Sequence, residues 1–503
     1  MTAQRPSRRM PSGPWVWLLS AIIGAAVGTA LALLFPAVLP EHSGHGVHAE
    51  PAIPLWLCIP FATLLGSIAL MPFISERFWH RHFPDFAFGL GAITAAYYLV
   101  AFNQPLHAGS GNNDPAHYLT FGQHHMLETA LEYYSFIALI GGLYIASGGV
   151  LITVRGKGTP LANTTLLAAG ALLANIVGTT GASVLLIRPF MRLNAGRLKP
   201  IHVVMFIFIV SNCGGALTPI GDPPLYLGYL KGVPFSWTLT NLWPMWATCI
   251  GMLLTMFFFI DRLIGPARTP KAKPADPAQS EPQPPHRLSV SVRGTRGIIA
   301  LTLIIAGVFI DPMLKANLGI EGIPIGATFQ IAVAITAYFV ASREIYAANE
   351  FSFFPVKEVG LLFIGIFATM APALGFLAAN GQRLGLDTPG TFYFATGSLS
   401  GVLDNAPTYL NFLQVAFGPT AIESDSVAAF LAEQGNPRRL AAVSLGAVFF
   451  GAMTYIGNGP NFMVRAIAES SGLRMPSFFG YCIRSLVLLL PVLTVVWLIF
   501  FRG

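Results

Sequence analysis

Charged residues are scarce in this sequence, and their scarcity excludes most classes of soluble protein. Asp, Glu, Lys and Arg make up 10% of the 503 residues, against about 25% in soluble domains. Hydrophobic residues make up 54% of the chain, and apolar stretches of about 20 residues, enough to cross a hydrocarbon layer, recur throughout it. We therefore expect an all-α polytopic membrane protein, and exclude a disordered chain, a coiled coil and a secreted disulfide scaffold.

Motifs for covalent, metal and nucleotide chemistry are also missing. The cysteines, Cys58, Cys213, Cys249 and Cys482, have no CxxC spacing, which argues against a disulfide framework or a structural zinc site. The chain contains no HExxH, no GxSxG and no Walker lysine loop. We therefore expect neither an enzyme nor an ATP-driven pump, no cofactor and no transition metal. The net charge of +7 comes from basic residues scattered through short loops, so a lipid bilayer is the expected partner and nucleic acid is not.

Apolar segments follow one another along the whole chain. The thirteen candidates are residues 14–39, 53–73, 86–102, 133–154, 163–187, 201–230, 241–264, 297–313, 323–341, 358–378, 391–417, 440–464 and 478–501. The first is too long for the core of a secretory signal, so we expect a retained helix. Residues 265–296 are rich in proline and basic residues and predict a disordered cytoplasmic linker between membrane halves 1–264 and 297–503.

The distribution of Lys and Arg predicts the topology. Cytoplasmic loops carry an excess of these residues. We therefore expect a multi-pass protein of the cell inner (plasma) membrane with its N-terminus on the cytoplasmic side. A full crossing by residues 163–187 would put Arg188, Arg192, Arg197 and Lys199 outside. A re-entrant hairpin keeps them inside, and its glycines and hydroxyl side chains suit a turn at membrane depth.

The two halves repeat this plan. We expect a cytoplasm-side hairpin (163–190) and a broken helix (201–230) in the first half, and an outside hairpin (391–418) and a broken helix (440–466) in the second. The whole is an inverted repeat of about eleven transmembrane helices plus two re-entrant hairpins and two broken helices, the plan of many secondary transporters. The halves share the order of their elements and breakers, with little residue identity.

The breaks carry the oxygen atoms that a dehydrated cation requires. Unwound backbone frees carbonyl groups that a continuous helix uses internally, and glycines allow close approach. Side-chain oxygens are added at the hairpin tips and in the broken helices by Asn175, Thr179, Thr180, Asn405, Ser211, Asn212, Thr218, Asn458 and Asn461. These residues are our candidate ion or substrate ligands.

Three motifs resemble a known superfamily. SNCGGALTPIGDPPL, LDNAPTYLNF and GNGPNFM resemble signature stretches of the ion transporter superfamily, nearest to its NhaD-type sodium/proton antiporters and its citrate-transport relatives. The resemblance covers residues 50–500. It implies a fold of eleven helices and two hairpins, an elevator-like alternating-access mechanism and a homodimer. Carboxylate carriers of the superfamily tend to have SNT-like hairpin tips, whereas this chain has NIVGTTG and LDNAP.

Two acidic residues, Asp222 and Asp404, decide between substrates. A carboxylate in the middle of a membrane costs about 2.5 to 3.5 kcal/mol, so each needs a compensating use. Either can hold sodium when ionised and a proton when neutral, and either would repel citrate unless cations or an arginine bound first. Arg188 is the only nearby candidate counter-charge that we identify. The alternative is that both aspartates cap half-helices.

Other candidates are less specific. Glu128 and Glu132 share one face of a helix entrance, either as a proton relay or as a solvated surface. His42, His45 and His48 have a metal-like spacing but lie in a glycine-containing loop, which favours a surface role. Tryptophans near segment ends, Trp246 among them, are typical of an interfacial belt.

A sodium or lithium/proton antiporter follows from these observations. It needs no cofactor beyond the transported sodium ion and proton, and its partners are small cations. The alternative of the same fold is a sodium- or proton-coupled citrate or dicarboxylate carrier. A passive channel would need neither a proton-titrating pair nor inverted repeats, so we rank it below both carriers.

Overall fold

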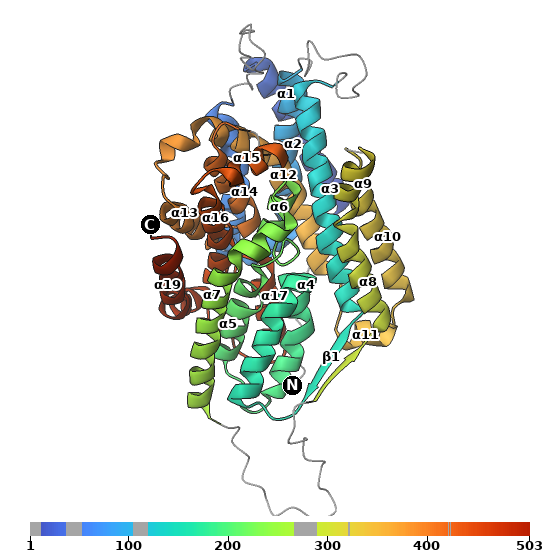
Figure 1. Ribbon diagram of the computed structural model, residues 1–503. Helices are drawn as coiled ribbons and strands as arrows, with labels where there is room; N and C mark the ends of the chain where they lie inside the picture. Colours follow the sequence, from blue (N-terminus) through green and yellow to red (C-terminus); the bar gives the residue numbers. More distant parts are fainter. Residues whose placement is uncertain are drawn as a thin grey trace, which may run out of the picture. The chain divides into compact units, whose positions relative to one another are not determined.

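The computed structural model describes residues 12–36, 53–103, 119–265, 289–319, 322–420, 422 and 424–502, and this part of the chain is almost entirely helical (Figure 1). The longer helices are α1 (Pro14–Leu34), α2 (Ile59–Ala101), α3 (Phe121–Gly148), α4 (Pro160–Leu193), α7 (Phe235–Ile264), α10 (Ile325–Val340), α12 (Phe354–Asn380) and α16 (Asn436–Phe450). The shorter ones are α5 (Pro200–Ile209), α6 (Pro223–Leu230), α8 (Thr295–Gly307), α9 (Ile310–Leu318), α11 (Arg343–Ala348), α13 (Pro389–Ser400), α14 (Asn405–Phe417), α15 (Ser424–Ala432), α17 (Gly459–Ser470), α18 (Phe478–Arg484) and α19 (Leu490–Phe500).

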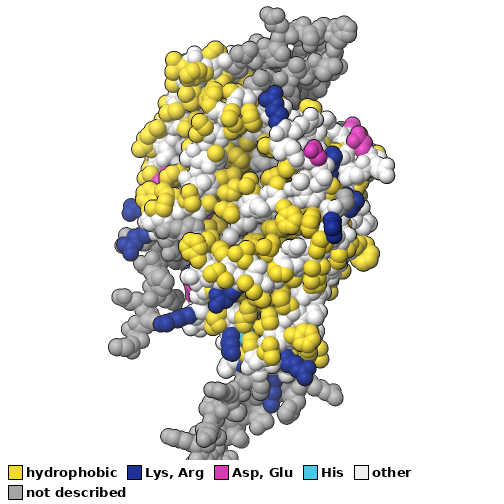
Figure 2. Space-filling view, turned by 90° about the vertical axis from the view of Figure 1, so that its left-hand side faces the viewer, with side chains coloured by type: hydrophobic (Ala, Val, Ile, Leu, Met, Phe, Trp, Pro, Cys, Tyr) yellow, Lys and Arg dark blue, Asp and Glu magenta, His cyan; other side chains and the backbone are white. Residues whose placement is uncertain are grey.

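Eight helical segments among the described residues are long and apolar enough to cross a membrane. Large apolar side chains remain exposed on them, for example Trp15 at 82% and Leu263 at 87%. Hydrophobic side chains cover much of the face shown in Figure 2, where Lys and Arg are sparse. A water-soluble protein rarely exposes apolar surface on this scale. The all-α polytopic membrane fold expected from composition is thus confirmed.

The helices form two compact units that do not follow the two halves of the chain. Unit 1 contains residues 1–135, 354–385 and 410–422, and unit 2 contains the remainder. In unit 1, α2 packs between α1 and α12. A Cβ on Gly365 of α12 would lie 2.6 Å from the backbone of Ala87 in α2, so glycine sets how closely these helices approach.

Helix α4, in unit 2, doubles back on itself. Its backbone leaves helical geometry at Gly178, whose φ of 77° suits glycine. Asn163 Nδ2 donates to Asn194 Oδ1 at 2.7 Å, and Asn194 Nδ2 returns a bond of 2.8 Å to Asn163 Oδ1. These residues would lie about 46 Å apart in a straight helix. The two arms of α4 therefore run side by side as a hairpin with its tip at Gly178.

A buried ion pair fastens the open end of this hairpin. Asp261 of α7 accepts hydrogen bonds from Arg197 and, at 2.8 Å, from His202 Nε2 of α5. Asn163 Nδ2 also donates to Asp261 Oδ2 at 2.8 Å. Because the Asp261 carboxylate is fully buried, each of these donors offsets part of its desolvation. The hairpin is thereby tied to α5 and α7.

Three further helices are interrupted at polar sequences. A break of residues 210–222, containing the short 3₁₀ turn Cys213–Gly215, separates α5 from α6. Residues 401–404 separate α13 from α14, and residues 451–458 separate α16 from α17. Glycine and proline disfavour continuous helix at these places.

The break expected between segments 53–73 and 86–102 lies at Ser75, where α2 leaves helical geometry between the apolar spans Leu55–Pro72 and Arg77–Ala101. The Ser75 hydroxyl accepts from Phe78 N at 3.3 Å and caps the helix that follows. Another segment differs from expectation: residues 151–154, expected at the end of a crossing helix, belong to strand β1 (Leu151–Arg155). It pairs antiparallel with β2 (Ser289–Arg293), at the end of the expected linker. β-Branched residues, consecutive in β1 and alternating in β2, favour these strands. Linker residues 266–288 lie outside the described residues.

Candidate functional site

The Asp222 carboxylate, at the end of the break before α6, is the centre of the site. Its Oδ1 accepts from Thr179 Oγ1 at 2.7 Å and from Asn458 Nδ2 at 3.0 Å. Its Oδ2 accepts from Asn405 Nδ2 at 2.6 Å. The four side chains are at most 2% exposed. Thus one buried carboxylate is held by three neutral donors that come from the α4 hairpin, the start of α14 and the second broken helix.

Asp222 has no cationic partner in the described part of the chain. The ion pairs found there do not include it. Arg188, the counter-charge suggested by the sequence, instead donates to Glu350 Oε2 at 3.0 Å near the surface. Asp222 stands at the N-cap position of α6, but its side chain makes no capping hydrogen bond. Helix capping therefore does not account for this carboxylate.

The two broken helices are more alike than the order of their elements indicated. Residues 215–224, GALTPIGDPP, and residues 451–460, GAMTYIGNGP, are identical at six of ten positions. This alignment places Asp222 opposite Asn458, which are in direct contact. The interruptions at Gly178 and at residues 401–404 correspond likewise, because Thr179 and Asn405 each begin the helical stretch that follows and each donates to Asp222. The two repeats therefore contribute to one site, in which Asp222 is charged and its counterpart Asn458 is neutral.

The remaining polar candidates in the first half hold the breaks in shape. Asn175 Nδ2 donates to Gly214 O at 2.6 Å, and Asn175 Oδ1 accepts from Leu217 N at 2.8 Å. Thr218 Oγ1 donates to Asn175 O at 2.6 Å. Ser211 Oγ lies 2.8 Å from Ser183 Oγ on the hairpin's second arm. These contacts fix the unwound backbone beside the tip, and the structure brings all of them together in unit 2.

Asn212 and Asn461 join the two breaks and leave one acceptor unused. Asn212 Nδ2 donates to Asn461 Oδ1 at 2.6 Å, and Asn461 Nδ2 donates to Gly451 O at 2.8 Å. Asn212 Oδ1 is buried with no hydrogen-bond partner among the described residues. Buried acceptors are rarely left unpaired, so this oxygen is a candidate ligand for a cation.

Close backbone packing explains the glycines. A Cβ on Gly215 would lie 2.5 Å from Thr179 Cγ2, and one on Gly221 would collide with Gly215 O. A Cβ on Gly451 would lie 3.3 Å from Asn212 Oδ1 and 3.4 Å from Asn405 Nδ2. Larger residues would therefore push the ligands apart.

Asp404 has different surroundings from Asp222. It precedes α14, and its Oδ1 accepts from Ala406 N at 3.0 Å while its carbonyl accepts from Thr408 Oγ1 at 2.8 Å. These contacts agree with the capping role that the sequence left open. The residue as a whole is partly buried, whereas Asp222 is 1% exposed.

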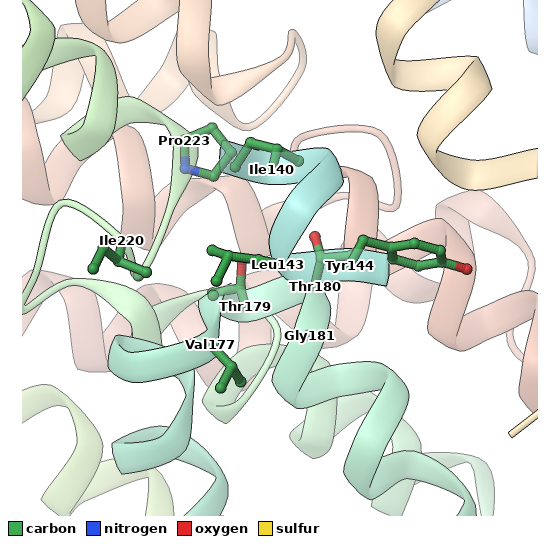
Figure 3. A pocket seen from close by; sticks show the side chains of 11 residues that line it. Ile140, Leu143, Tyr144, Val177, Thr179, Thr180, Gly181, Ile220 and Pro223 are labelled. Carbon is green, nitrogen blue, oxygen red and sulfur yellow. The ribbon is translucent and has the colours of Figure 1, made fainter. Parts of the chain in front are cut away.

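A small cavity of about 10 Å³ adjoins the hairpin tip (Figure 3). It is lined by Thr179, Thr180 and apolar side chains that include Leu143 and Ile220. This space accommodates one water-sized group. Thr180 thus lines the cavity next to Thr179, which contacts Asp222.

The other polar candidates lie elsewhere. Glu128 and Glu132 belong to unit 1, whereas the Asp222 cluster lies wholly in unit 2. Glu128 is exposed beside His124. His42, His45 and His48 lie outside the described residues.

Two aromatic residues that the sequence did not associate with the site support the breaks. Trp246, expected in the interfacial belt, donates from Nε1 to Gly214 O at 2.9 Å. The Tyr481 hydroxyl donates to Ala452 O at 2.9 Å in the second break. Each donates a hydrogen bond to a backbone carbonyl that has no helical partner where the helix is unwound. The sequence did not indicate this role, because both aromatic residues lie far along the chain from the carbonyls they contact.

Comparison with known proteins agrees with a transporter. Residues 50–501 match a family described as "Putative citrate transport". Uncharacterized transporters of Mycobacterium bovis and Mycobacterium tuberculosis are each 25% identical over 332 residues, which cover 63% of this chain and 72% of each relative. With its apolar helices and broken-helix site, the chain belongs to this citrate-transport family and is a multi-pass membrane transporter.

Proposed function

We propose that the protein exchanges a small monovalent cation, sodium or lithium, for a proton at Asp222. The main support for this proposal is that the Asp222 carboxylate is buried among neutral side chains and has no ion-pair partner among the described residues. A bare charge in such a place is costly and is neutralised by a cation or a proton. Since one carboxylate takes one or the other, binding of the two is mutually exclusive, which is the requirement for exchange.

The surrounding side chains suit both states. A hydroxyl and an amide each contain a donor and an acceptor. Thr179, Asn405 and Asn458 donate to the carboxylate in the structure, and rotation of the same groups offers oxygen atoms to a bound cation. The unpaired Asn212 Oδ1 is a further oxygen between the two breaks. Hard cations of this kind prefer such oxygen ligands.

Citrate or dicarboxylate transport is the second candidate, and the family description favours it. Two observations favour the cation. The cavity at the hairpin tip holds about 10 Å³, whereas pockets for organic ligands are usually about 300 Å³ or larger. The central charge is also negative and would repel a carboxylate. A carboxylate would require neutralisation of Asp222 first.

Transport by the purified protein in sealed vesicles separates the two functions. We expect an imposed pH gradient to dissipate when sodium or lithium is added, and less with choline, a cation too large for the site. Uptake of labelled citrate should stay at the level of empty vesicles. Sodium-dependent citrate accumulation without cation-induced proton movement would replace the antiport proposal with the carrier.

A further inference from the structure

A cluster of two histidines and a glutamate at the start of α3 is separate from the Asp222 site and belongs to unit 1. His124, His125 and Glu128 each offer a ligand atom, and these atoms lie within 4.8 Å of one another. We propose that they bind a divalent transition-metal ion of the zinc type. This extends beyond the transport proposal and departs from the expectation, drawn from motif spacing, that the chain holds no such metal.

The spacing of the donors is close to that of a metal site. His124 Nδ1 lies 3.5 Å from a Glu128 carboxylate oxygen. Ligands about 2.0–2.2 Å from a tetrahedral zinc ion are separated by about 3.3–3.6 Å. The two residues are four apart on a helix, which places them on one face. The ligand atom of His125 needs to move only slightly toward the other two to complete a three-ligand site.

The histidine nitrogens are prepared for this role. His124 Nδ1 is buried and makes no hydrogen bond within the described chain. His125 Nδ1 lies 3.3 Å from Phe121 O, and its ring stacks on that of Phe121 with centroids 4.0 Å apart. These two contacts hold the His125 ring in place. One of its nitrogens is among the three ligand atoms that lie within 4.8 Å of one another.

The carboxylate supplies adaptability and access. The Glu128 side chain is 53% exposed, so it can adjust to the ion and admit a water molecule as the fourth ligand. Two imidazoles and a carboxylate suit zinc better than magnesium or calcium, which prefer sets made only of oxygen. Another His–Glu pair, His80 and Glu358, has its nitrogen and oxygen 3.8 Å apart, and within the described residues it belongs to no group of three metal-ligand side chains. It provides a matched comparison.

The test is calorimetric titration of zinc chloride into the full-length, untagged protein after removal of metals with a chelator. We expect one saturable site that weakens at least about tenfold in Glu128→Gln and in His124→Ala. The control variant His80→Ala should bind as the wild type does. Cobalt(II), titrated separately, should give the visible absorption of a four-coordinate ion in the wild type and lose it in Glu128→Gln.

Glu128→Gln changes an exposed side chain without changing its size, so it should remain folded. Monodisperse elution and an unchanged melting temperature verify this. Equal zinc affinity in the wild type and Glu128→Gln, or absence of saturable binding in the wild type, would overturn the site. Neither result depends on whether the protein exchanges cations for protons.

Discussion

At the scale of single residues, two aspartates of similar sequence setting have different partners. Each directly precedes a half-helix that follows a break. The Asp222 carboxylate accepts from three side chains of other elements, whereas Asp404 accepts from the backbone of its own helix. The chemical requirement therefore differs, because an amide can replace a carboxylate as a cap but cannot carry the charge that a cation needs.

This difference predicts unequal effects of the same substitution. Asp222→Asn should abolish cation/proton exchange, since the site can then neither release a proton nor balance a cation. Asp404→Asn should retain most of the exchange, because asparagine is about as good an N-cap as aspartate. Initial rates in vesicles with equal protein incorporation measure both. Full loss in Asp404→Asn with activity left in Asp222→Asn would reverse the assignment.

At the scale of elements, the two breaks are pseudo-equivalent and differ in one charge. Gly215–Gly221 in the first break correspond to Gly451–Gly457 in the second, and each pair brings backbone into close contact. Trp246 and Tyr481 satisfy a carbonyl in each break. The glycines and the aromatic donor are thus present in both breaks, whereas the carboxylate, Asp222, is present only in the first.

Exchanging the charged and neutral members of the pair tests this equivalence. Asp222→Asn alone should be inactive, and the double variant Asp222→Asn with Asn458→Asp should recover part of the exchange. The reason is that Asn458 Nδ2 lies 3.0 Å from Asp222 Oδ1, so an aspartate at position 458 would place its negative charge close to the original one. Proton release on sodium addition is the readout. No recovery in a stable double variant would indicate that the two positions are not interchangeable.

Backbone packing in the first break gives a stability prediction. Gly221→Ala places a methyl group against Gly215 O and should cost about 1–3 kcal/mol. The ligands should also separate, so exchange should fall. Gly251→Ala in α7 is the control, because nothing lies within 4 Å of its added methyl group. Thermal unfolding in detergent compares them, and equal melting temperatures would contradict the close approach.

At the scale of the whole molecule, one enclosed carboxylate limits the charge carried in each cycle. If Asp222 alone exchanges one cation for one proton, both states of the carrier have the same charge. A membrane potential should then neither drive nor oppose exchange. Rates measured with and without an imposed potassium diffusion potential should agree within about twofold. A strong dependence on potential would mean that a second titrating group, for which Asp404 is the candidate, takes part.

The two compact units could not be predicted from the order of the helices along the chain. The sequence divides naturally at the proline-rich stretch, yet unit 1 combines the first part of the chain with residues 354–385 and 410–422. Helices that contact lipid or each other have similarly apolar sequences, so hydropathy does not identify their partners. The strands at 151–155 and 289–293 were missed because each has only five residues and its partner lies far along the chain.

The sequence by itself determined that this is a helical membrane protein, and it located the polar breaks where oxygen atoms gather. Low charge and long apolar runs are sufficient for the first, because the bilayer excludes unpaired backbone. Glycine, proline, asparagine and aspartate in apolar segments are sufficient for the second. Only tertiary structure distinguished Asp222 from Asp404, since the side chains that donate to Asp222, those of Thr179, Asn405 and Asn458, lie 43, 183 and 236 positions away along the chain.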